Sequence, residues 1–115
     1  MCFGTDSLYS SPIPHPRSFH STVHFINEYV KKRKVLSLED AIRRMTGETA
    51  SRFGLDDRGI IEEGKAADIV VFDLDRLEEG EDKCNKGFEM VMVNGRIVLR
   101  QDRVTGAKSG RVLVR

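Results

Sequence analysis

The sequence has only two cysteines, no long apolar segment and almost no net charge, and each of these features excludes a class of protein. Cys2 and Cys84 stand far apart and neither belongs to a CxxC pair, which argues against a zinc ribbon or a redox dithiol. No apolar run reaches the roughly 18 residues that a membrane-spanning helix needs. The first residues also lack the basic and apolar regions of a signal peptide. We therefore expect a soluble, cytoplasmic protein.

The charges are nearly balanced, with nineteen Lys and Arg against eighteen Asp and Glu and a formal net charge of +1. We therefore expect no overall attraction to nucleic acid or to an anionic membrane. The basic run at residues 31–34 could be a local phosphate patch, but its position favours the solvated end of a helix. With 115 residues the chain can form one compact domain, but not a barrel enzyme of about 250 residues.

The first half of the chain predicts an irregular segment followed by helices. Residues 1–18 hold all three prolines and show no periodicity, so they indicate a loop. Between residues 20 and 34, apolar side chains recur at three- and four-residue steps, which predicts a helix with one apolar face.

A second helix should begin at Ser37, whose side chain would accept a hydrogen bond from the backbone of Asp40 while the Asp40 carboxyl reaches back. We expect this helix to end at Thr46 or Gly47. Residues 49–55 then predict a short helical turn, closed by Gly54 and with two side chains packing inward, Phe53 and Leu55.

The second half of the chain predicts strands, of which the one at residues 69–72 is central. This apolar, β-branched run lies between two aspartates and follows a turn at Gly64, so we expect a strand that is covered on both faces. Residues 60–61 should begin a strand before it, and the charged residues from 74 to 85 should form a surface loop.

The strongest local signal is the Asn94-Gly95 pair between two apolar segments, 88–93 and 96–100. This pair suits a two-residue type I′ turn and therefore predicts a β-hairpin. A turn near residues 105–110 should lead to a terminal strand at 112–114. The predicted fold is α+β, with two or three helices followed by a mostly antiparallel sheet of about four to five strands.

The residues that could carry chemistry lie in the first quarter of the chain. His15, His20 and His24 fall within ten residues, and the last two could share a helical face as metal ligands. The HExxH glutamate is absent, however, so ordinary helix or loop histidines are favoured. Asp6 is a lone carboxylate beside Gly4 and Thr5, and chemistry alone favours a turn or capping role.

A set of motifs spread along the chain resembles the C-terminal part of N-acyl-D-amino-acid deacylases (D-aminoacylases) in the metal-dependent amidohydrolase superfamily. The Gly-x-x-Ala-Asp-x-Val-Val-Phe-Asp run at residues 64–73 is shared by many members, including dihydroorotases and hydantoinases. The segment from Asp6 to Arg17 resembles the deacylase branch more narrowly. The other motifs are Pro14-His15-Pro16-Arg17, residues 36–46, Phe53-Gly54-Leu55, residues 57–61 and Val93-Asn94-Gly95.

The resemblance implies a division of the chain into two parts. Residues 1–57 would be the end of a TIM-barrel catalytic domain, and residues 58–115 the C-terminal share of the small β-sandwich domain. Asp6 would be the catalytic carboxylate that accepts a proton from metal-activated water, with possible contact to the metal. Arg17 would receive the substrate carboxylate, a role that suits its bidentate guanidinium. His15 would shape the loop.

The resemblance also implies zinc and a small N-acyl-amino-acid substrate for the full-length enzyme. The family's metal-binding His-x-His, its bridging residue and its middle-strand histidines have no counterpart here. Residues 20–25 also depart from the family's usual run. We therefore expect a C-terminal fragment of a hydrolase of amide C–N bonds that is inactive and binds no metal alone. The alternative is a non-catalytic domain that associates with itself, as a homo-oligomer, or with a separate barrel chain.

Overall fold

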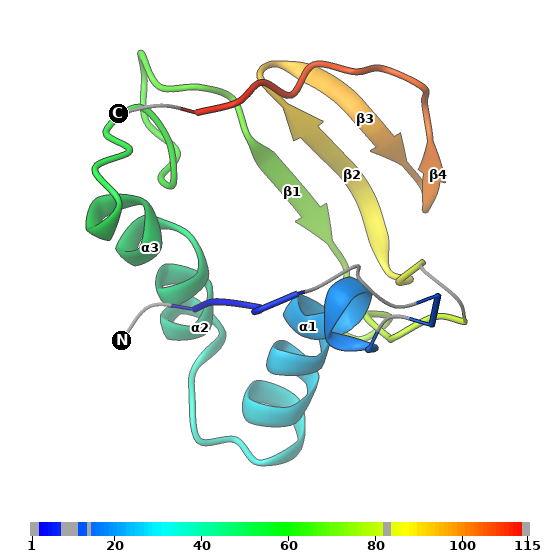
Figure 1. Cartoon of the computed structure of the whole chain (residues 1–115). Coiled ribbons are helices and arrows are strands. Elements are labelled where there is room, and N and C mark those ends of the chain that lie inside the picture. The colour runs from blue at the N-terminus through cyan, green and yellow to red at the C-terminus, as the bar shows by residue number, and fades with distance from the viewer. Residues whose placement is uncertain (1–2, 8–11, 14, 82–83, 114–115) are drawn as a thin grey trace.

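The protein consists of a helical half beside one antiparallel sheet, as the computed structural model shows (Figure 1). The structure describes residues 3–7, 12–13, 15–81 and 84–113. The helices are, in chain order, α1 (Arg17–Ile26), the π-helix η1 (Asn27–Lys32), α2 (Leu38–Met45) and α3 (Gly47–Arg52). The strands are β1 (Ile69–Phe72), β2 (Phe88–Val93), β3 (Arg96–Arg100) and β4 (Arg103–Val104), and they lie in the order β1-β2-β3-β4. The predicted α+β class is confirmed.

The hairpin formed by β2 and β3 is confirmed at its turn. Asn94 and Gly95 both have positive φ angles, 48° and 80°, as a type I′ turn requires. The backbone N–H of Asn94 donates to the Asp68 carboxylate (2.8 Å), and its side-chain amide donates to the Ser109 carbonyl (2.8 Å). The turn is therefore tied both to the residue that precedes β1 and to the C-terminal segment.

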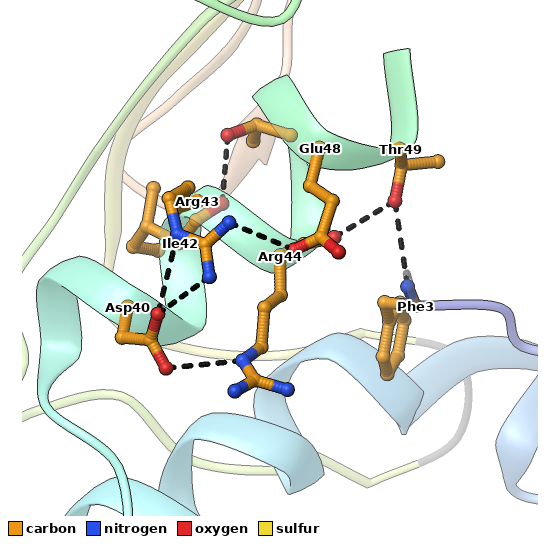
Figure 2. A network of polar contacts seen from close by, with 8 residues as sticks. Phe3, Asp40, Ile42, Arg43, Arg44, Glu48 and Thr49 are labelled. Carbon is orange, nitrogen blue, oxygen red and sulfur yellow. Dashed lines mark hydrogen bonds and ion pairs between the residues drawn. The ribbon is translucent and has the colours of Figure 1, made fainter. Parts of the chain in front are cut away.

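The predicted helices are also confirmed, with one change at a cap. The Ser37 hydroxyl accepts from the backbone N–H of Asp40 (3.1 Å), and α2 has Thr46 as its C-cap. The Asp40 carboxylate does not complete the predicted reciprocal bond, because its two oxygens bind Arg43 and Arg44 instead (Figure 2). A guanidinium pair on the same helix competes successfully for this short side chain.

The hydrophobic core lies between α1 and the segment that follows β1. Val23 and Ile26 of α1 are buried against Leu77, which is only 2% exposed. We expected residues 74–85 to form a surface loop, and for Leu77 that expectation was wrong. The segment closes on itself through a backbone bridge between Glu78 and Lys86, which turns Leu77 toward the helix.

A polar stripe on α1 and η1 reinforces this core. Four side chains spaced at three- and four-residue steps point to the same segment: His20 contacts Asn85, His24 contacts Glu79, and Asn27 and Lys31 donate to the Leu77 carbonyl, at 2.9 and 3.4 Å. Lys31 also donates to the Leu74 carbonyl (2.9 Å). The helix therefore holds this otherwise irregular segment by side-chain contacts on one face.

The stretch before β1 is fixed by a nearly buried arginine. The Arg58 side chain is 10% exposed and donates to both Asp57 (3.2 Å) and Asp68 (2.6 Å). The hydrogen bond from Arg58 lowers the pKa of the Asp57 carboxyl. Since Asp68 also accepts from Asn94, Arg58 links the turn at residues 57–59 to the hairpin.

Three expectations about apolar residues were wrong. The strand at 69–72 forms, but β1 is an edge strand, and Val70 and Val71 are 49% and 46% exposed rather than covered on both faces. Residues 60–61 form no strand, because the chain turns at Gly59 against Ala50 and turns again after residue 62. Phe53 is half exposed, since it lies at the C-cap of α3.

The end of the chain also differs from expectation. Of the predicted strand at 112–114, residues 112 and 113 are not in a strand, and residue 114 lies outside the described residues. The fourth strand is instead β4, which follows a turn with positive φ at Gln101 and Asp102. The Asp102 carboxylate accepts from the N–H groups of Gly87 and Phe88, so this turn is held to the start of β2.

Replacing Leu77 by Ala tests the location of the core. We expect Leu77→Ala to lower the free energy of unfolding by about 2–5 kcal/mol, because it leaves a cavity beside Val23 and Ile26. Leu113→Ala is the matched control, since Leu113 is 42% exposed, and it should change stability far less. Equal losses in urea unfolding of the two variants would contradict this placement of the core.

The ion pairs of α2 generate a prediction about pH. Hydrogen bonds from Arg43, and then from Arg44, lower the pKa of the Asp40 carboxyl below its ordinary value of 3.8. The pairs therefore contribute stability above that value, and the contribution is lost as the pH falls through the lowered pKa. Wild type should have a higher thermal midpoint than Asp40→Asn at neutral pH. A difference that stays constant from pH 7 to pH 2 would contradict the assignment.

Candidate functional site

Asp6 and Arg17, the two residues singled out by the resemblance, lie together in the structure. An Asp6 carboxylate oxygen is 3.8 Å from Arg17 Nη1, although ten residues separate the two in the sequence. Both side chains face solvent, with exposed fractions of 87% for Asp6 and 43% for Arg17. The structure therefore forms an open pair of opposite charges at the start of α1.

Arg17 owes its position to the first turn of α1. Its backbone N–H donates to the His15 ring nitrogen Nδ1 (3.1 Å), and its carbonyl accepts from the Ser21 hydroxyl. Pro16 stands at the N-cap, where a residue without an N–H leaves no donor unsatisfied. His15 thus accepts from one of the N–H groups in the first turn of α1, as a side-chain cap would.

Asp6 has an unusual backbone conformation. Its φ angle is +50°, in the left-handed region that non-glycine residues seldom occupy, though aspartate tolerates it better than most. The hydroxyls of Thr5 and Ser7 lie 3.2 Å apart on either side of it. Such conformations persist where the surrounding structure holds them, and they are common at functional sites.

A carboxylate beside a guanidinium at an open surface can do two kinds of chemistry. The carboxylate can accept a proton from a water molecule and pass it on. The guanidinium has five N–H donors in a planar fork, and its one contact with a described residue leaves others able to bind a ligand carboxylate. The pair could therefore hold an acidic substrate and serve it as a base.

The three histidines do not converge on a metal site. His20 Nδ1 lies 2.5 Å from Asn85 Oδ1, His24 Nδ1 lies 2.6 Å from Glu79 Oε1, and His15 caps α1. Among the described residues, no group of three or more His, Cys, Asp or Glu side chains could hold a metal ion. The described part of this chain therefore does not fit a zinc ion by itself.

Three residues of the basic run at 31–34 make contacts within the chain. Lys31 donates to two carbonyls, and Arg33 binds Glu28 (2.7 Å) while its guanidinium lies 5.5 Å from the centre of the Tyr29 ring. Lys32 also lies near Glu28, at 3.8 Å. Lys31 and Lys32 lie in the last turn of η1, where cations complement the helix dipole.

The sequence analysis did not identify the contacts that hold the segment containing Asp6. The ring of Phe3 packs on Phe25 of α1, with centroids 5.1 Å apart, and its backbone N–H reaches the Thr49 hydroxyl of α3 at 3.4 Å (Figure 2). An aromatic residue in a segment without periodicity gives no signal of its partner. Only the three-dimensional arrangement identifies these contacts.

No described helix combines the length and the apolar character that spanning a membrane would demand. The exposed Cys84 is a free thiol.

Comparison with known proteins gives close relatives among deacylases. The N-acyl-D-aspartate deacylase of Alcaligenes xylosoxydans xylosoxydans is 35% identical over 115 residues, which cover 96% of this chain and 23% of that protein. The crystal structure of a D-aminoacylase superposes with a TM-score of 0.89 at 35% identity, covering 99% of this chain and 25% of that one. An N-acyl-D-glutamate deacylase from Bordetella bronchiseptica, solved with zinc and a phosphonate inhibitor, superposes with a TM-score of 0.84 at 34% identity, covering 97% and 24%.

These matches confirm the resemblance that the sequence motifs indicated. The structural match is to the C-terminal region of D-aminoacylase, and the chain spans about a quarter of the length of these relatives. A model of the amidohydrolase family matches residues 1–99. The chain therefore belongs to the amidohydrolase family.

Proposed function

We propose that this chain is the C-terminal part of a metal-dependent hydrolase that cleaves the amide bond of N-acyl-D-amino acids. The observation that carries the proposal is the 3.8 Å contact between Asp6 and Arg17, which unites the two residues that the deacylase motifs single out. The relatives named as N-acyl-D-aspartate and N-acyl-D-glutamate deacylases support the substrate class. A cytoplasmic location is part of the same proposal.

In the proposed reaction, water adds to the acyl carbon and the C–N bond breaks, giving a carboxylic acid and an amine. Asp6 accepts a proton from the attacking water and donates it to the departing nitrogen. Arg17 binds the α-carboxylate of the substrate and so places the amide beside Asp6. The two side chains carry opposite charges and already lie 3.8 Å apart.

The described residues form no group of three or more side chains that could hold a metal ion, so most of the metal ligands of the proposed enzyme would lie outside them, with Asp6 able to supply one contact. The Bordetella bronchiseptica relative contains zinc, which supports a metal in the longer enzyme. We propose, in line with the motifs, that residues 1–57 complete a barrel-type catalytic domain and that residues 58–115 form part of a small β-sandwich. The change from helices to sheet between α3 and β1 agrees with that boundary.

A hybrid enzyme tests the proposed reaction. Residues 1–115 would replace the matching region of the D-aminoacylase, and hydrolysis of N-acetyl-D-amino acids would be measured with zinc present. We expect the hybrid to be active and the isolated chain to be inactive. Asp6→Asn should lower kcat by about 10²- to 10⁴-fold, the contribution of a positioned proton acceptor. Arg17→Lys should mainly raise KM, because lysine cannot form the bidentate contact.

Two substitutions of the same kind serve as controls. Asp75→Asn and Arg103→Lys change exposed residues of the sheet half and should leave kcat and KM close to the values of the parent hybrid. A folded, zinc-loaded hybrid without deacylase activity would refute the proposal. So would full activity in the Asp6→Asn variant.

A second candidate function, a non-catalytic associating domain, is favoured by the exposed apolar side chains around β1. Val70, Val71 and Ile61 are 49%, 46% and 85% exposed, and β1 has one free edge in the four-stranded sheet. Such edges and patches tend to bind another chain. The association would be with a second copy or with a separate barrel chain.

Light scattering of the isolated chain tests this candidate. Self-association predicts a molecular mass that rises with protein concentration, and Val71→Lys should abolish the rise by placing a charge on the edge strand. Arg103→Lys, on the opposite edge strand β4, is the control. A strictly monomeric species at high concentration would exclude self-association.

A further inference from the structure

We infer that Phe3 is a positioning residue for Asp6. It acts through two contacts, a ring contact with Phe25 on α1 and a backbone hydrogen bond to Thr49 on α3. The inference deepens the proposed function and rests on the role of Asp6 in it. No motif of the sequence predicted a contact among these three residues. Phe3 touches neither member of the Asp6–Arg17 pair in a contact described above, so its effect must pass through the backbone of residues 4–5.

The segment from Phe3 to Asp6 lies along α1 with matched spacing. Phe3 packs on Phe25 with ring centroids 5.1 Å apart, and Asp6 approaches Arg17 at 3.8 Å. Three extended residues cover about 10 Å, and the eight helical steps from Arg17 to Phe25 cover about 12 Å. The two contacts therefore fix both ends of one short segment on one helix, with the segment running opposite to the helix direction.

The ring of Phe3 occupies the end of an aromatic row on this helix. Phe25 packs on Tyr29 (5.3 Å between centroids), and the Arg33 guanidinium lies over the Tyr29 ring at 5.5 Å. Tilted aromatic pairs at these distances are favourable beyond the area that they bury. Phe3 therefore has a defined packing position on α1, although it belongs to a segment without regular secondary structure.

The second contact of Phe3, with Thr49, belongs to the network of polar contacts in Figure 2. The Thr49 hydroxyl accepts from the Phe3 backbone N–H (3.4 Å) and donates to the Arg44 carbonyl (2.8 Å) at the end of α2. Arg43 of α2 pairs with Asp40 on the same helix (2.8 Å) and with Glu48 of α3 (2.9 Å), so Thr49 belongs to a helix that is linked to α2. Phe3 is thus fixed to two helices at once.

This attachment has a consequence at Asp6, whose backbone is held in the left-handed region. A φ of +50° in a non-glycine residue persists where the surrounding structure holds the backbone in place. Arg17 contacts the side chain of Asp6. Three residues earlier, the contacts of Phe3 with Phe25 and Thr49 supply a fixed point for the backbone. Loss of that fixed point would let the segment relax and move the carboxylate. Misplacement by about 1 Å is enough to cost a large part of a catalytic rate.

The first test uses the 115-residue chain and does not depend on activity. The Arg17 Nε–H signal is recorded by ¹H-¹⁵N NMR, and Asp6→Asn marks the shift that accompanies loss of the pair. Phe3→Ala should move the signal in the same direction by at least half as much. Thr49→Val should also move it, whereas Thr49→Ser keeps the acceptor and should restore the wild-type position. Unchanged methyl signals of Val23 and Leu77 show that the core is intact.

The matched control is Phe53→Ala, the same substitution at a phenylalanine that is 51% exposed at the C-cap of α3. It should leave the Arg17 signal in place. If Phe3→Ala and Thr49→Val leave the Arg17 signal where it is in wild type, the inference is wrong. The same holds if Phe53→Ala shifts it as much as Phe3→Ala does, because the effect would then be general.

The second test uses the active hybrid enzyme. Phe3→Ala should lower kcat at least tenfold and change KM less than threefold, because it displaces the proton acceptor and leaves Arg17 on its helix. Thr49→Ser should retain the parent kcat, and Thr49→Val should not. A purely structural role would instead lower the amount of folded enzyme at unchanged kcat per active site. An inactive hybrid would refute the proposed function, while the NMR result would still decide whether Phe3 holds Asp6.

Discussion

The contact between α1 and the segment after β1 is the interaction on which the rest of the structure depends. Leu77 buries itself against Val23 and Ile26, and Phe72 and Phe88 pack around this cluster from the sheet. The helical half and the sheet half thereby share one core. Since Arg17 begins α1, the same contact also sets where the candidate site stands relative to the sheet.

Polar contacts fix the register between α1 and the segment after β1. An apolar cluster alone would permit the helix to slide or rotate over the segment, because the hydrophobic effect has no direction. Asn27 and Lys31 donate to backbone carbonyls of the segment, and His20 and His24 contact its side chains, which fixes one register. Burying a carbonyl such as that of Leu77 without these donors would carry a desolvation cost.

The elements that the sequence predicted well are those with a local physical cause. Asn94-Gly95 forms the hairpin turn because both residues tolerate a positive φ, and Ser37 caps α2 through its own hydroxyl. Leu77 was missed because its neighbours are charged and its partner lies some fifty residues away. The apolar run of β1 indicated a strand correctly, but periodicity shows only that a face is apolar and cannot show whether anything covers it.

The candidate site was predictable only through resemblance. No local rule places an aspartate beside an arginine eleven residues away, and residue chemistry alone favoured a turn role for Asp6. The structure shows the two side chains together, yet both face solvent, with Asp6 87% exposed. In water the attraction between such charges is weak and strongly screened. The same pair in a site that excludes water, where the dielectric constant is lower, interacts several times more strongly.

The exposure of the pair therefore agrees with the short span of this chain relative to its relatives. A proton acceptor gains from a dry site, where its pKa responds to neighbouring charges and where a bound carboxylate has no competing water. The chain supplies the geometry, since α1 orients Arg17 and Phe3 ties the Asp6 segment to two helices. In the proposed enzyme the remaining three quarters would exclude water from this pair of charges, which stands at an open surface in the present chain.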